Sequence, residues 1–281
     1  MRPISVVVAA LLGLVALDAN AQGAKPKPGP AVVAVGPAFA MTHAVAQKLR
    51  SGDEAQVRAV LDDIRLAGRA AHAAAPVVAE ILQRGLSAGL TEAALDTLGD
   101  VEAETASSSV AMYTSHRNVA LRRAAVKALI KTKGPVAVRA LRHALSDGDR
   151  AVRGMAATGL GTLKAKDAVS DLFLALDHNV PEAAAAVGQL CAPQECDQLS
   201  AKLGRLPFDV VTGGLDQVLF RPAKDVSDDE KVKIVGKLRE LGTQEANKFL
   251  KDVQKRWPQG WSSRVKQSID QGVAATVGGS Q

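Results

Sequence analysis

The sequence predicts an all-α protein, an α-solenoid of stacked helical hairpins with a helical C-terminal cap. Three observations favour this fold class. The chain matches itself with a period of about 31 residues, within the range typical of helical solenoids. Each unit carries apolar residues at the spacing i, i+3, i+4 and i+7, which is typical of an amphipathic helix. Aromatic residues make up only 3% of the 281 residues, so the core is built from Ala, Leu and Val, which favours packed helices over β-sandwiches and barrels.

Residues 1–21 have the three parts of a secretory signal peptide. Arg2 gives a basic start, residues 4–17 are apolar, and Ala19-Asn20-Ala21 is a cleavage signal. An uncleaved membrane anchor is the alternative, but the apolar run is shorter than the roughly 20 residues that cross a bilayer. We therefore expect an exported protein, periplasmic or secreted, without a transmembrane span.

The repeats occupy the body of the chain. A shift by one period places 118–148 on 149–179, with Leu121 on Val152 and Leu129 on Leu160. This predicts about five helical hairpins between residues 51 and 206, with a capping helix near 39–49 in front. Two short amphipathic helices cannot bury their apolar faces alone, so we expect the copies to stack.

The period fades after residue 206. Ser227 and Glu230 form a capping box that opens a helix, and Trp257 and Trp261 are expected to pack over the apolar end of the stack. A ligand site lined by these two tryptophans is the alternative. The predicted order is signal peptide 1–21, Pro/Lys-rich linker 22–34, repeat array 35–206, helical cap 207–273 and loose tail 274–281.

Residues 147–163 (Asp-Gly-Asp-Arg-Ala-Val-Arg-Gly-Met-Ala-Ala-Thr-Gly-Leu-Gly-Thr-Leu) carry an acidic turn, a Val-Arg pair and a helix of small residues. This pattern resembles the short HEAT-like repeats first described in phycobilin lyases. The resemblance implies a HEAT-like solenoid in which the arginine of each Val-Arg pair bonds to an acidic residue of a neighbouring repeat; ligand binding by these arginines is the alternative. The arginines concerned are Arg58, Arg122 and Arg153, and the expected acceptors are Asp53, Asp147 and Asp149.

The chain has two cysteines, Cys191 and Cys196. An oxidising compartment favours a disulfide between them, with two free thiols as the alternative. The C-x4-C spacing and the lack of a second ligand pair argue against a redox or metal site.

The sequence shows no catalytic constellation. None of the five histidines forms an H-x3-H or H-E-x2-H pair, and neither a P-loop nor a Gly-x-Ser-x-Gly motif is present. His116, Asp147 and His178 follow one another at the repeat period, but equivalent positions in packed helices lie about 8–10 Å apart, too far for shared metal ligation at about 2 Å. We expect a non-catalytic protein with no metal and no cofactor.

Charge is arranged in blocks along the chain. Residues 117–166 hold twelve bases and two acids, between blocks 85–115 and 167–201 that hold only acids. The basic band predicts either binding of a polyanion or an anionic envelope component, or attraction between neighbouring repeats. Export disfavours nucleic acid. The candidate anion-binding residues are Arg122, Arg123, Lys127 and Lys131.

The HEAT-like resemblance implies that the second helix of each repeat faces a partner. The leading functional expectation is therefore an interaction scaffold or adaptor that binds a protein partner, which would be acidic if it binds these basic residues. A polyanion-binding protein is the alternative, and a lyase-type enzyme is the third possibility. For Phe173, the alternative to a partner-binding role is that its side chain belongs to the buried core. The candidate partner-binding residues are Met112, Arg139, Arg142, His143 and Phe173.

Overall fold

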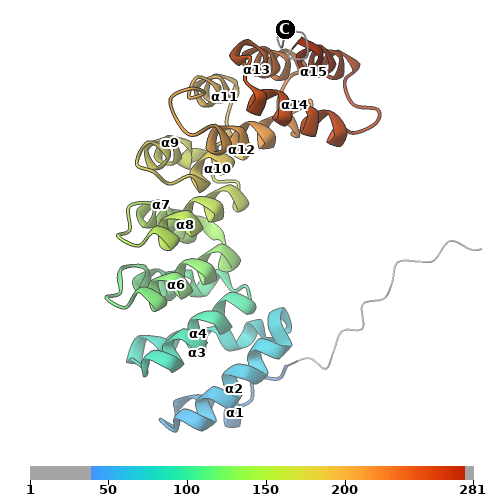
Figure 1. Ribbon diagram of the computed structural model, residues 1–281. Coiled ribbons are helices and arrows are strands. Elements are labelled where there is room, and N and C mark those ends of the chain that lie inside the picture. Colours follow the sequence, from blue (N-terminus) through green and yellow to red (C-terminus); the bar gives the residue numbers. More distant parts are fainter. Residues whose placement is uncertain (1–38, 276–281) are drawn as a thin grey trace, which may run out of the picture. The chain divides into compact units, whose positions relative to one another are not determined.

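The computed structural model describes residues 39–275, which contain helices and turns but no strand. The helices pair into a stack of hairpins (Figure 1), which confirms the α-solenoid. They are α1 (His43–Arg50), α2 (Glu54–Ala67), α3 (Ala75–Arg84), α4 (Ala88–Asp100), α5 (Ser107–Ala111), α6 (Val119–Thr132), α7 (Gly134–Ala144), α8 (Arg150–Thr162), α9 (Val169–Asp177), α10 (Glu182–Leu190), α11 (Pro193–Ser200), α12 (Phe208–Leu219), α13 (Asp228–Leu241), α14 (Gln244–Arg256) and α15 (Ser263–Ala275).

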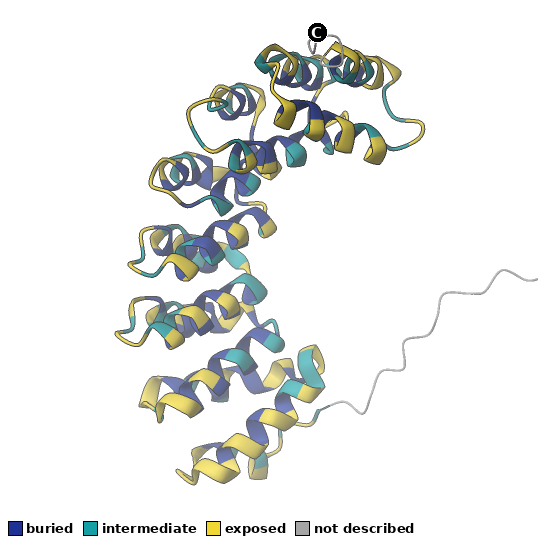
Figure 2. Cartoon of the chain, viewed as in Figure 1, coloured by how far each residue is buried: buried dark blue, intermediate teal, exposed yellow. Residues whose placement is uncertain are grey.

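Five hairpins form the repeat array: α2/α3, α4/α5, α6/α7, α8/α9 and α10/α11. The first helices of consecutive hairpins pack directly on one another, α4 on α6, α6 on α8 and α8 on α10. Helix α1 packs against α2 and α3 and caps the first repeat. Figure 2 shows the buried residues on the sides where neighbouring helices face each other, and they form one continuous core along the stack.

Small residues allow the first helices to approach closely. A Cβ atom added to Gly99 in α4 would lie 3.1 Å from the Cα of Ala128 in α6. The same addition to Gly161 in α8 would lie 3.2 Å from the Cα of Ala186 in α10. These distances leave little room for a larger side chain, so the Ala- and Gly-rich composition follows from the packing.

The stack continues past the end of the predicted array. Helix α12 packs along α10 as one first helix packs on the next, through Gly188 and Gly214, whose backbones nearly touch. The sequence period has faded here, but the stacking of one helix on the next continues. Helices α13, α14 and α15 then pack on one another at the end of the chain. Helix α15 includes residues 274 and 275, so the predicted loose tail begins two residues too early; residues 276–281, like the predicted signal peptide and linker, lie outside the described residues.

The capping box that opens α13 is present. The Ser227 side chain accepts the backbone N–H of Glu230, and the Glu230 carboxylate accepts the N–H of Ser227. Gly242 ends the helix in the left-handed conformation, with φ of 63°. None of the helices in residues 39–275 is long and apolar enough to cross a membrane.

An aromatic cluster closes the C-terminal end of the stack; we call Phe220, Lys231, Trp257 and Trp261 the closing cluster. The Lys231 side chain is 2% exposed, and its ammonium lies 5.7 Å and 4.9 Å from the ring centroids of Trp257 and Trp261. It donates a hydrogen bond to the carbonyl of Arg221. The tryptophans therefore pack as expected, although around a buried cation that the sequence did not predict.

Three turns that connect the first and second helices hold a residue with positive φ one period apart, at Glu102, Lys133 and Lys164. Lys133 has φ of 64° and ψ of −163°, a region that is adopted almost only by glycine. We expect Lys133→Gly to be more stable than Lys133→Ala by about 1 kcal/mol, because glycine relieves the strain. Both variants lose the 3.1 Å ion pair with Glu102, so the difference between them isolates the backbone. Urea denaturation measures it, and equal stabilities would contradict the assignment.

Candidate functional site

The basic residues of α6 bind acidic residues of neighbouring repeats. Arg122 donates to both carboxylate oxygens of Asp147 at 2.8 Å, and Arg123 donates to both oxygens of Asp149 at 2.9 and 2.7 Å. The hydrogen bonds from Arg123 lower the pKa of Asp149 to about 2. Burial alone would raise the pKa of Asp147, but hydrogen bonds from Arg122 and a backbone N–H leave it below its ordinary value. Both carboxylates are therefore ionised at neutral pH.

The two lysines of α6 point the other way along the stack. Lys127 reaches Asp96 at 3.1 Å and Lys131 reaches Asp100 at 2.5 Å, both in α4. All four residues predicted to bind an anion are thus paired with acids of adjacent repeats. The arrangement supports the alternative interpretation of the basic band, that these charges attract neighbouring repeats.

The arginines of the Val-Arg pairs follow the expected scheme only in part. Of these three arginines, Arg122 alone pairs with an acidic residue of a neighbouring repeat, Asp147. Arg58 donates instead to a backbone carbonyl of α4 at 3.0 Å, and Arg153 donates to two carbonyls of its own turn. Asp53 caps its own helix. Arg153 has no acidic partner ahead because the next turn, 178–181, contains no acidic residue.

Several hollows lie along the turns that connect the second helix of one repeat with the first helix of the next. We call the surface of these turns the turn edge. A groove of about 410 Å³ lies where turns 85–87 and 112–118 meet, and it includes Met112, His116 and Arg117. Another groove, of about 380 Å³, lies between turns 145–149 and 178–181.

An exposed apolar side chain lines each of these grooves. Met112 lines the first and Leu174 the second, and each is 58% exposed. They stand two repeat periods apart, so they occupy equivalent positions, with His143, also exposed, at the position between them. The sequence predicted Met112 and His143 on a partner surface, and both are exposed. It also predicted Phe173 there, but in that repeat the exposed residue is the neighbouring Leu174.

The other three candidate partner residues are less available. Phe173 is half-buried, and the Lys202 ammonium lies 5.9 Å from its ring centroid. Arg142 is held by Asp171 at 2.5 Å. Arg139 is exposed on α7 but lines neither groove.

The charge that lines these two grooves without a partner is positive. Arg117 lines the first groove and Arg153 the second, while Arg150 stands in the first turn of α8. None of these three forms an ion pair with an acidic residue of the described chain. The acids that line the second groove, Asp147 and Asp171, are already paired with arginines.

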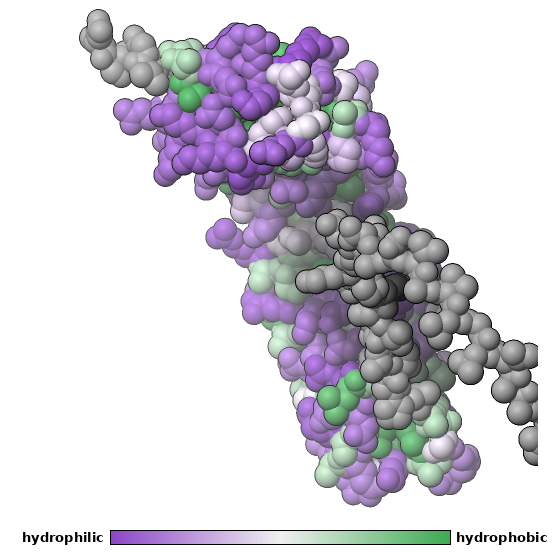
Figure 3. All heavy atoms as spheres, turned by 90° about the vertical axis from the view of Figure 1, so that its right-hand side faces the viewer, coloured by the Kyte–Doolittle hydropathy of each residue, from purple (hydrophilic) through white to green (hydrophobic). Residues whose placement is uncertain are grey.

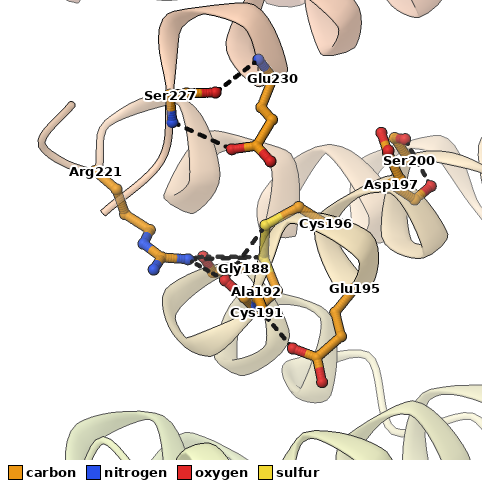
Figure 4. The surroundings of a disulfide bond; sticks show 10 residues. All are labelled: Gly188, Cys191, Ala192, Glu195, Cys196, Asp197, Ser200, Arg221, Ser227 and Glu230. Atoms are coloured by element: carbon orange, nitrogen blue, oxygen red, sulfur yellow. Dashed lines mark hydrogen bonds between the residues drawn. A yellow bond between two sulfur atoms is a disulfide. The ribbon is translucent and has the colours of Figure 1, made fainter. Parts of the chain in front are cut away.

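A disulfide joins Cys191 and Cys196, whose Cα atoms are 5.3 Å apart. Figure 4 shows the Arg221 side chain extending toward it, and its Nη1 donates to the Cys191 carbonyl at 2.7 Å. The Glu195 carboxylate accepts the backbone N–H of Ala192 at 2.7 Å. The disulfide therefore links the end of α10 to the start of α11, and Arg221, which follows α12, contacts this link. The role of the disulfide is structural.

Three or more potential metal-ligating side chains do not come together anywhere in residues 39–275. His116, Asp147 and His178 occupy successive turns of the turn edge. Trp257 and Trp261 contact the Lys231 side chain at the closing cluster.

Residues 110–191 match the HEAT repeat family. A comparison with curated proteins finds no match. Among solved structures, a chain from the complex of CpcE and CpcF of phycocyanin lyase from Nostoc sp. is similar, with 18% identity, TM-score 0.43, and coverage of 90% of this chain and 99% of that chain. An engineered protein has 15% identity, TM-score 0.46, and coverage of 83% and 77%. A designed armadillo repeat protein has 14% identity, TM-score 0.41, and coverage of 83% and 98%. The match over residues 110–191 supports a HEAT-like helical repeat protein, and the stacked hairpins of residues 39–275 show an α-solenoid fold.

Proposed function

We propose that this protein is an exported, non-catalytic scaffold that binds a partner protein along the turn edge. The repeat architecture supports an interaction role, because stacked hairpins present the same surface at regular intervals. The observation that carries the proposal is the pair of exposed apolar side chains, Met112 and Leu174, at equivalent positions in two grooves. Exposed apolar residues beside arginines are typical of the centres of protein interfaces.

Binding of a polyanion or an anionic envelope component by the basic band has weaker support. Its four candidate residues would have to leave their acidic partners before they could bind an anion. Figure 3 shows a mainly hydrophilic surface over the C-terminal helices, which lie outside the basic band. No arrangement within residues 39–275 favours a lyase-type activity.

Export rests on residues 1–21 of the sequence. We expect the native protein to be recovered from the periplasm or the medium with Gln22 as its first residue. Cell fractionation and N-terminal sequencing check this, and recovery of the intact N-terminus in the cytoplasmic fraction would contradict it.

Three aspartate variants test the turn edge. We expect Met112→Asp and Leu174→Asp each to reduce the amount of co-purified partner by about tenfold, because a charge replaces an apolar contact. Leu66→Asp is the matched control, since Leu66 is 88% exposed but lies at the end of α2, outside both grooves. Quantitative mass spectrometry of the captured material measures the ratio. Equal retention by all three variants, or equal loss, would exclude the turn edge as the binding surface.

A further inference from the structure

We infer that the segment bound at the turn edge is an extended, acidic stretch of polypeptide with two apolar residues six positions apart. This inference rests on the proposed function, because it assumes that the turn edge binds a protein, and it adds the chemistry and spacing of the part that is bound.

The spacing follows from the positions of the two apolar side chains. Met112 and Leu174 are separated by two repeat periods. Packed helices lie about 8–10 Å apart, so two repeats span roughly 16–20 Å. An extended chain rises about 3.3 Å per residue, and side chains at even spacing point to the same side. Six positions, about 20 Å, satisfy both conditions.

The shape of the turn edge favours an extended chain over a helix. The hollows that contain Met112 and Leu174 are two separate grooves of about 410 and 380 Å³. Each is suited to one or two side chains, whereas a bound helix needs a continuous trough about 10 Å wide. An extended segment can place one apolar side chain in each groove and cross turns 112–118 and 145–149 on the way.

Charge determines the character of the remaining residues of the segment. Arg117 lines one groove and Arg153 the other, and neither has an acidic partner in the described chain. The acids that line the second groove, Asp147 and Asp171, are neutralised by arginines. A segment that carries Asp or Glu around its apolar residues therefore complements the edge, and a basic segment is repelled.

Labelled peptides with two leucines in a background of Glu and Ser provide the test. The probe set varies only the distance between the leucines, from about three to about ten positions, and binding to the full mature protein is followed by fluorescence polarisation. We expect the affinity to be highest at six positions and about fivefold lower for a scrambled peptide of the same composition. Replacing Glu with Lys in the best peptide should abolish binding.

Variants show whether the peptide occupies the turn edge. Met112→Ser, Leu174→Ser and Arg117→Glu should each weaken binding of the best peptide by about fivefold or more, and Leu66→Ser should leave it unchanged. Arg150→Glu is a second charge variant that breaks no ion pair of the described chain.

Two outcomes would overturn the inference. Affinity that does not depend on leucine spacing, or polyglutamate binding as well as the best peptide, would mean attraction of negative charge alone. Affinity that is highest near thirteen positions would mean a helix, whose rise is about 1.5 Å per residue. If the aspartate variants still lose the natural partner in either case, the proposed function stands and only the nature of the bound segment is wrong.

Discussion

Gly214→Ala is expected to destabilise the protein by about 3 kcal/mol or more, although it adds a single methyl group. A Cβ at this position would lie 2.5 Å from the carbonyl oxygen of Ala184 in α10, closer than non-bonded atoms approach. The obstructing atom belongs to a helix backbone, so α10 and α12 must move apart, and overpacking of this kind typically costs about 1–3 kcal/mol and occasionally more.

Gly213→Ala is the matched control for this prediction. The neighbouring glycine is exposed, and a Cβ there would meet nothing within 4 Å. Alanine favours a helix over glycine by about 1 kcal/mol, so the control should be more stable than the natural protein. Thermal and urea unfolding measure both variants, and a stable Gly214→Ala protein would show that α10 and α12 do not cross at this point.

Lys231→Ala should lower the free energy of unfolding by about 2–4 kcal/mol. The side chain fills the space between Trp257, Trp261 and the carbonyl of Arg221, so its removal leaves a cavity and an unpaired carbonyl. Lys231→Met keeps the volume and should lose much less. Urea unfolding at pH 7 compares the two variants, and equal losses would mean that the charge, rather than the packed stem, stabilises the closing cluster.

The same lysine predicts a pH dependence with a definite sign. Burial lowers the pKa of Lys231 below its ordinary 10.5, and the charge of Arg221 lowers it further, against an opposing contribution from Asp228. Between the lowered pKa and 10.5, the unfolded chain therefore binds more protons than the folded protein. Under this condition the free energy of unfolding increases as the pH rises. We expect the natural protein to gain stability relative to Lys231→Met over that window. A constant difference between the two would contradict the lowered pKa.

The repeat architecture was predictable because its signal is periodic. The match of the chain to itself located the hairpins, and the capping box of Ser227 and Glu230 located α13. The sequence did not predict that the stack continues through α12, because the repeat period has faded in this part of the chain. The signal of this continuation was the row of small residues, Ala184 and Gly188 in α10 and Gly214 in α12, which allows two helices to touch.

The pairing of the basic band was also present in the sequence. Asp96 and Asp100 lie one period before Lys127 and Lys131, so stacking places each acid beside its lysine. The exposure of Leu174 was harder to predict. Adjacent helical residues differ by about 100° in direction, and only the structure shows that Lys202 lies over the neighbouring Phe173.

The ion pairs have a consequence for how the protein responds to its surroundings. Charged contacts couple the second repeat to the third and the third to the fourth, whereas α10 and α12 are coupled by backbone contact at Gly188 and Gly214. Salt weakens exposed charge pairs but not close apolar packing. Rising ionic strength should therefore loosen the contact between α4 and α6 more than the contact between α10 and α12.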